Sequence, residues 1–361
     1  MRQTLGCAVV LALVVGCGKT KPPRTSALSS PESSASESTS TAPAAKAAEK
    51  PNYLANVLKP RAEVATGHPR KEYESSRLYL NRDGTRIVAG LMDGTVTQVW
   101  DLRDPPKKLC EVRGAAGPMS PDGKLFVRNG GLSAEVIDAE TGKVVSTIES
   151  LWGFQFRAPG SLLAYRKDRP KPDEPFAYLV RRFDPATGKA AEGFTVPVNG
   201  DMHVSWGAAG ELVVGTVKTK KVQVWDVAAK KVVREYSLPV GDRSVWSNFA
   251  VTPDGKRFLA GAGKGFEVFD ANTGESLGLG AQLSLGPLLV PGRDLVLERH
   301  TFGDEKFKVH SGYVAYDYRQ KKPVAFLPAD GFAEAVSDDG RVAVLTTKAG
   351  NLTVWDLTQV P

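Results

Sequence analysis

The chain is poor in side chains that could carry out catalysis. It has four histidines and three cysteines among 361 residues. Imidazole and thiolate groups bind zinc, or act as base and nucleophile, when several of them converge. Here His68, His203, His300 and His310 follow no metal-ligand spacing, although the last two flank one segment. A Gly-x-Ser-x-Gly turn and a Gly-rich phosphate loop are also lacking, so the sequence predicts no catalytic centre, metal site or cofactor.

A different pattern organises the chain: a large apolar or aromatic residue followed by Asp, at the end of a strand-like run. It occurs seven times, at spacings of 37, 46, 42, 44, 47 and 39 residues. A period near forty residues is typical of the blades of a β-propeller. The seven copies are Trp100-Asp101, Ile137-Asp138, Phe183-Asp184, Trp225-Asp226, Phe269-Asp270, Tyr316-Asp317 and Trp355-Asp356.

Each unit consists of short strand-like runs separated by turn residues. In the first unit, Val/Ile/Leu-rich runs cover 76–80, 86–91, 95–100 and 108–112, with Asp-Gly turns after the first and second runs. Such runs bounded by Asp-Gly or Pro-Gly indicate antiparallel hairpins. A four-stranded sheet cannot bury both of its faces alone, so neighbouring units must stack. We therefore predict an all-β, seven-bladed β-propeller with four antiparallel strands in each blade.

The motifs of these units resemble WD40 repeats, and the resemblance covers nearly all of 52–358. It is carried by Ser120-Pro-Asp-Gly-Lys124, Thr252-Pro-Asp-Gly-Lys256 and the two Trp-Asp strands 94–101 and 350–356. The family joins a His, a Ser or Thr, an Asp and the Trp of one blade through hydrogen bonds. Blade one has His68, Asp93 and Trp100, but Ala89 stands where the hydroxyl is expected. The chain thus resembles divergent bacterial members of the family.

The ends of the repeat region indicate how the ring closes. Only five residues follow Asp356, which is too few for a fourth strand in the last blade. The segment 57–66, which precedes the first unit, is compatible with a strand. We predict that this segment completes blade seven.

Strand alternation assigns each loop to one of two faces. The turns between second and third strands, and the crossings between blades, share what we call the loop-rich face. Insertions at 168–175 and 301–310 place most of the length variation there, and loops on a rigid scaffold often carry function. Aromatic and Arg residues are common interface anchors, but the tryptophans could instead be buried between blades, and the insertions and basic residues could be ordinary solvated surface. The candidate partner-binding residues are Trp152, Arg157, His203, Trp206, Arg243, Trp246, Arg169, Lys171, Lys218 and Lys220.

The N-terminal segment predicts export. Residues 1–16 combine Arg2 with an apolar run that is too short to span a membrane, which is the layout of a secretory signal. The ending Val14-Val-Gly-Cys17 resembles the bacterial lipobox, which implies cleavage before Cys17 and lipidation of its thiol. By the sorting rule of Gram-negative lipoproteins, Gly18 in place of Asp favours the outer membrane. A plain secretory signal with an incidental Cys17 is the alternative.

Residues 17–50 are rich in Ser, Thr, Ala, Pro, Glu and Lys and contain no aromatic residue. This composition predicts a disordered tether between the lipid and the propeller at 51–361. Of the net charge of +7, Arg2 contributes one and the tether two. The charge left on the propeller is too dilute to predict nucleic-acid binding. After processing, Cys110 could pair only with Cys17, so no disulfide is expected if that thiol carries lipid.

These observations lead to two hypotheses. The first is a monomeric, lipid-anchored propeller in the bacterial cell envelope that binds an unidentified protein partner through its loop-rich face. The second is a propeller enzyme, a hydrolase or lyase, that acts on glycan or peptide in the central channel. Propeller enzymes gather catalytic groups from several blades, so sequence spacing does not exclude the second hypothesis.

Overall fold

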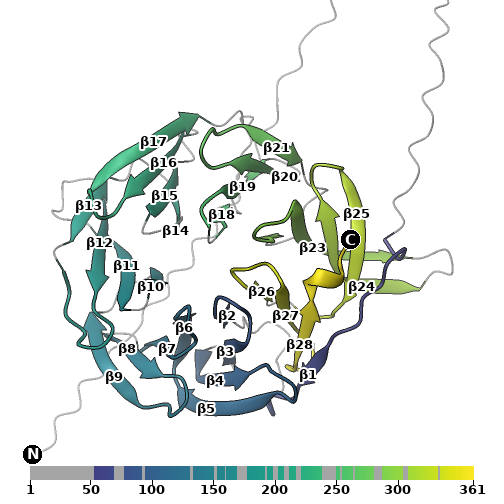
Figure 1. Ribbon diagram of the computed structural model, residues 1–361, viewed down its shortest axis with the longest axis horizontal. Coiled ribbons are helices and arrows are strands. Elements are labelled where there is room, and N and C mark those ends of the chain that lie inside the picture. The colour runs from purple at the N-terminus through teal and green to yellow at the C-terminus, as the bar shows by residue number, and fades with distance from the viewer. Residues whose placement is uncertain are drawn as a thin grey trace, which may run out of the picture. The chain divides into compact units, whose positions relative to one another are not determined.

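The repeats fold into seven sheets of four antiparallel strands, arranged as blades in a ring (Figure 1). This confirms the predicted fold. The computed structural model describes residues 53–68, 77–91, 94–130, 133–149, 153–158, 160–168, 177–191, 193–197, 202–206, 211–216, 221–237, 249–252, 254–262, 265–279, 287–303, 308–331 and 334–361. The signal, Cys17 and the tether lie outside the described residues.

The blades follow one another along the chain, and each runs from an inner to an outer strand (Figure 1). Blade one contains β2 (Arg77–Leu80), β3 (Arg86–Leu91), β4 (Val96–Asp101) and β5 (Lys107–Arg113). Blade two contains β6 (Ala115–Met119), β7 (Leu125–Asn129), β8 (Ser133–Asp138) and β9 (Val144–Glu149). Blade three contains β10 (Gly153–Ala158), β11 (Ser161–Asp168), β12 (Ala177–Phe183) and β13 (Phe194–Pro197). Blade four contains β14 (Met202–Trp206), β15 (Glu211–Thr216), β16 (Lys221–Asp226) and β17 (Lys231–Ser237).

Blade five contains β18 (Phe249–Val251), β19 (Arg257–Ala262), β20 (Gly265–Asp270) and β21 (Ser276–Leu279). Blade six contains β22 (Leu288–Leu289), β23 (Leu295–Gly303), β24 (Val309–Asp317) and β25 (Lys322–Pro328). Blade seven contains β26 (Glu334–Val336), β27 (Val342–Thr346), β28 (Leu352–Asp356) and, as its outer strand, β1 (Ala62–Val64), with the 3-10 helix η2 (Leu357–Gln359) after β28.

The core lies between blades. One cluster joins Val88 and Val99 of blade one to Met119 and Phe126 of blade two. The strand β27 is buried at every residue because it packs against neighbours on both faces. Strands buried on both faces consist of continuous apolar runs, which explains why the second strands of the repeats lack a clear alternation of polar residues.

Side chains of the repeat fix its turns. In blade two, the Ser120 hydroxyl donates to Asp122 at 2.7 Å and accepts from the Leu125 amide at 2.9 Å. Gly123 supplies the positive φ of 72° that this turn requires. The signature residue Asp138 accepts hydrogen bonds from the backbone and hydroxyl of Thr141, which hold the turn after the third strand and lower the pKa of Asp138. The recurring Asp therefore has a structural role.

The indole N–H of the repeated Trp donates to an acceptor other than the expected hydroxyl at position 89. Trp100 Nε1 donates to Gln98 Oε1 at 3.0 Å, and Gln98 Nε2 donates to Glu111 at 2.9 Å. Ala89, the expected hydroxyl position, is buried in the core. Blade four repeats the arrangement, because Trp225 donates to Gln223, which donates to Glu235. In blades one and four, the indole thus donates to a Gln two residues before the Trp, whereas in blade seven Thr353 is the acceptor at that position.

The segment before the first blade closes the ring, as predicted. β1 pairs antiparallel with β28, with Ala62 opposite Val354 and Val64 opposite Leu352. The predicted stretch 57–66 nevertheless does not lie on blade seven alone. Val57 forms a parallel bridge with Phe326 of blade six. We call residues 53–68 the N-terminal arm.

The far end of the arm contacts blade one. The Thr66 hydroxyl donates to the Gly350 carbonyl at 2.9 Å, and the Thr66 carbonyl accepts from Gln98 at 2.9 Å. His68 lies beside this contact, with its Nε2 3.7 Å from Glu111 Oε2. The N-terminal arm therefore joins blades six, seven and one.

Candidate functional site

Most of the candidate partner-binding residues lie outside the described residues. Arg157 lies in β10 and His203 in β14, but their side chains are outside what the structure describes. The register pairs His203 with Gly215, near the start of β14 and hence toward the loop-rich face, whereas Arg157 lies near the opposite end of its strand. The candidates outside the described residues altogether are Trp152, Arg169, Lys171, Lys218, Lys220, Arg243 and Trp246.

Trp206 differs from the prediction. It is the last residue of β14 and pairs with Leu212, so it lies at the end of the blade away from the loop-rich face. Only 8% of its surface is exposed, and its ring centroid lies 5.8 Å from that of Tyr165. Trp206 is thus a core residue between blades three and four, which corrects its assignment to a partner-binding surface.

Of the basic residues next to the predicted insertion at 168–175, Arg166 is paired with an acid. Arg166 and Lys167 lie near the end of β11, on the loop-rich face. Arg166 Nη1 is 2.6 Å from Glu149 Oε1, and Arg181 bonds the other carboxylate oxygen. Glu149 ends the outer strand of blade two. These pairs join blades two and three, and they reduce the positive charge available to an acidic partner.

The predicted insertion in blade six is a hairpin rather than an irregular loop. The strands β23 and β24 are nine residues long and include Thr301–Gly303 and Val309–His310. The hairpin extends outward from the ring, and the N-terminal arm passes it before reaching β1 (Figure 1). Tyr53 of the arm lies against it, with ring centroids 5.3 Å from His300 and 5.0 Å from Phe302.

This junction contains a buried acid. Glu298 of β23 is fully buried, and its Oε2 lies 3.1 Å from His300 Nε2. Burial and the charge of Glu298 raise the pKa of Tyr53 above its ordinary value, which favours the neutral phenol. His310 stacks on Phe302 at 5.5 Å. Within the described residues, no group of three or more His, Cys, Asp or Glu is arranged to hold a metal ion.

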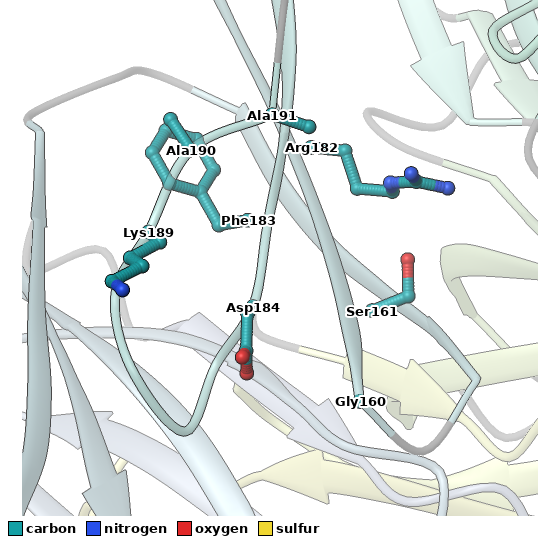
Figure 2. A pocket seen from close by; sticks show the side chains of 8 residues that line it. All are labelled: Gly160, Ser161, Arg182, Phe183, Asp184, Lys189, Ala190 and Ala191. Carbon is teal, nitrogen blue, oxygen red and sulfur yellow. The ribbon is translucent and has the colours of Figure 1, made fainter.

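A hollow of about 430 Å³ lies on the opposite face of blade three. In five other blades the residue after the signature Asp donates its N–H to the turn between the first two strands, as Leu102 does to Thr85 at 2.7 Å. Blade three has Pro185 at this position, and proline has no N–H. The closing bond is therefore impossible there. The hollow is lined by Gly160, Ser161, Arg182, Phe183, Asp184, Lys189, Ala190 and Ala191 (Figure 2).

The side chains around the hollow offer recognition rather than catalysis. Ser161 and Arg182 point toward the same open space, and Lys189 points away from it (Figure 2). Asp184 accepts bonds from the Ala186 amide and the Thr187 hydroxyl, which lower its pKa. None of the lining residues is a histidine or a cysteine that could activate Ser161 or replace it as nucleophile.

No helix within the described residues is long and apolar enough to cross a membrane.

Comparisons with known proteins identify the fold alone. No protein-family model and no curated protein match the chain. Among solved structures, 1069 chains match. One is a chain in the crystal structure of a mitotic checkpoint complex, with a TM-score of 0.54 and 16% sequence identity over 97% of this chain and 98% of that chain. So widespread a fold does not by itself assign a function.

Proposed function

We propose that the chain is a lipid-anchored, extracytoplasmic propeller that binds a protein partner through its loop-rich face. The observation that carries the proposal is that the repeated Asp and Trp residues stabilise the fold. The signature Asp residues hold turns and the Trp residues bond within their own blades. Recognition is thereby left to the loops that do not repeat. A propeller of the same fold is part of a mitotic checkpoint complex, which supports an interaction role.

The binding part of the proposal predicts capture of a specific partner. Crosslinking in intact cells, followed by purification of the tagged full chain, should recover one protein reproducibly. Trp152→Ala and Trp246→Ala should each reduce that recovery at least fivefold. Lys124→Ala is the matched control, because this exposed side chain lies on the opposite face. Recovery that is unchanged in both Trp variants would contradict binding through the loop-rich face.

The anchoring part is tested separately. Cys17→Ser should move the chain from the membrane fraction to the soluble fraction and abolish incorporation of labelled fatty acid. If the unaltered chain is found in the membrane fraction but incorporates no labelled fatty acid, the prediction of lipid attachment at Cys17 is wrong. The alternative, an enzyme acting on glycan or peptide in the channel, stays a prediction from the sequence.

A further inference from the structure

The first half of the N-terminal arm pairs with the outer strand of blade six at one residue, the isolated parallel bridge of Val57, while residues 53–56 form turns and bends. The Leu58 amide donates to the Phe326 carbonyl at 2.9 Å, and the Phe326 amide donates to the Asn56 carbonyl at 2.8 Å. The Asn56 side chain also donates to the Val324 carbonyl at 3.4 Å. An outer strand of a blade exposes unpaired N–H and C=O groups that can pair with another segment. Here the chain's own residues occupy that edge.

Side chains at both ends of this half fix it in place. Tyr53 and Leu54 pack against the core cluster between blades five and six, which includes Phe326. Leu58 is 7% exposed and belongs to the cluster between blades six and seven. Val57, between these anchors, is 48% exposed. The segment therefore crosses the outer edge of blade six with one backbone bridge in its middle and apolar contacts at each end.

The strand pairing that completes blade seven does not use these residues. The outer strand of blade seven is supplied by Ala62–Val64. Lys59 and Pro60, which connect the two parts of the arm, are exposed. Among the described residues, the contacts on blade six are one bridge, a few hydrogen bonds, one buried leucine and the packing of Tyr53 and Leu54. A covalently attached segment acts at a millimolar effective concentration, so weak contacts suffice to hold it.

We propose that the outer edge of blade six is a peptide-binding site that residues 53–58 occupy in the free protein. Its ligand is a segment of a partner protein with an aromatic residue and two leucines spaced as in Tyr53, Leu54 and Leu58, which turns near the aromatic residue and pairs with the strand edge just before the second leucine. His300 and Phe302 receive the aromatic ring, and the Phe326 backbone supplies the strand pairing. The site runs along the outer strand of blade six and reaches Phe302 in the 301–310 hairpin of the loop-rich face, and its test with a synthetic peptide does not require capture of the partner proposed above.

The test uses the full chain with Tyr53→Ser, Leu54→Ser and Leu58→Ser, which we call the open variant, and a fluorescent peptide of residues 53–59. The open variant should bind the peptide saturably, and at least tenfold more tightly than the unaltered chain does. A peptide with serine at the same three positions should not bind. Phe302→Ala in the open variant should weaken binding at least fivefold, because it removes the aromatic contact.

The melting temperature shows whether the open variant is folded. It should melt cooperatively, below the unaltered chain because buried Leu58 is lost but above the chain that lacks residues 53–66, because these substitutions leave β1 intact. A folded open variant that fails to bind the peptide, or that binds it no better than the unaltered chain, overturns the proposal. Loss of cooperative melting also overturns it, since the segment would then be part of ring closure. The single variant Tyr53→Ser is a milder change and should bind the peptide with an affinity between those of the unaltered chain and the open variant. If it binds no better than the unaltered chain, that result counts against the site.

These results are independent of membrane anchoring and of capture at the loop-rich face. Purified protein and a synthetic peptide are sufficient, so a negative result leaves the proposed function standing. Failure of partner capture in cells likewise leaves the peptide site standing.

Discussion

At the scale of single residues, Gln98 connects three parts of the fold. It is fully buried and bonds the Trp100 indole, the Glu111 carboxylate and the Thr66 carbonyl of the arm. Replacing it with alanine leaves the buried Thr66 carbonyl and the half-buried Trp100 indole without their partner, whereas the exposed Glu111 carboxylate can bond water. Because an unsatisfied buried polar group costs roughly 1–3 kcal/mol, Gln98→Ala should lower the free energy of unfolding by about 2–3 kcal/mol, measured by urea denaturation.

Gln223 provides the matched control. It bonds Trp225 and Glu235 in the same way, but it is only partly buried. Water can replace the lost bonds at this position, so Gln223→Ala should cost about 1 kcal/mol or less. Equal losses for the two variants would show that burial by the arm contributes nothing to the role of Gln98.

The thiol of Cys110 should react slowly. Burial, with the charge of Asp138, raises its pKa from 9.0 to about 11, and its Sγ lies 3.3 Å from the Ala139 carbonyl. The thiolate is the reactive form, so at pH 8 the folded chain should react with a disulfide reagent about 100-fold more slowly than the unfolded chain. The rate should rise about tenfold with each pH unit until pH nears 11. The measurement needs Cys7 and Cys17 replaced by serine, and a fast pH-independent reaction would contradict the shift.

At the scale of elements, the turns between first and second strands pack onto the neighbouring blade. Gly340 and Gly292 hold the same place in blades seven and six, with φ of 70° and 71°. A Cβ on Gly340 would lie 2.1 Å from the Pro291 carbonyl oxygen, whereas one on Gly292 would meet nothing within 4 Å. Positive φ costs a non-Gly residue about 1–2 kcal/mol. Gly292→Ala should therefore cost about 1 kcal/mol, and Gly340→Ala at least about 3 kcal/mol, in chemical denaturation. Similar costs would show that the turn of blade seven can move away from blade six.

The repeat predicted these elements well because strands and turns are set locally. In blade one, the expected run 86–91 is β3, and the others differ from the observed strands by one or two residues. The residues of the binding surface were harder to predict. Trp206 was assigned to the wrong end of its strand, because the sequence does not show where β14 begins. The contact of Val57 with blade six is a single bridge between residues 269 positions apart, and no local pattern encodes it.

At the scale of the whole molecule, blade six receives segments from both ends of the propeller. The arm crosses its outer edge, with Leu58 in the cluster between blades six and seven. Arg293 of blade six donates to the carbonyls of Leu357, Val360 and Pro361, which follow the last strand of blade seven. The junction of blades six and seven is therefore held by the N-terminal arm, through Leu58, and by the C-terminal residues, through Arg293. The stability of the ring should therefore be most sensitive at this junction.

Deletion of residues 53–66 from the full chain tests this expectation. The deletion removes β1 and exposes the edge of β28, where Leu352 and Val354 pack with Val64, which is only 2% exposed. We expect the melting temperature to fall by at least about 10 °C, because one kcal/mol shifts it by about 2–4 °C in a large domain. Calorimetry should also show a broader transition, and the uncovered edge should promote association between molecules. The open variant is the control, because it alters the arm on blade six and retains β1. If the deletion melts like the open variant, blade seven is stable with three strands, and the arm does not close the ring.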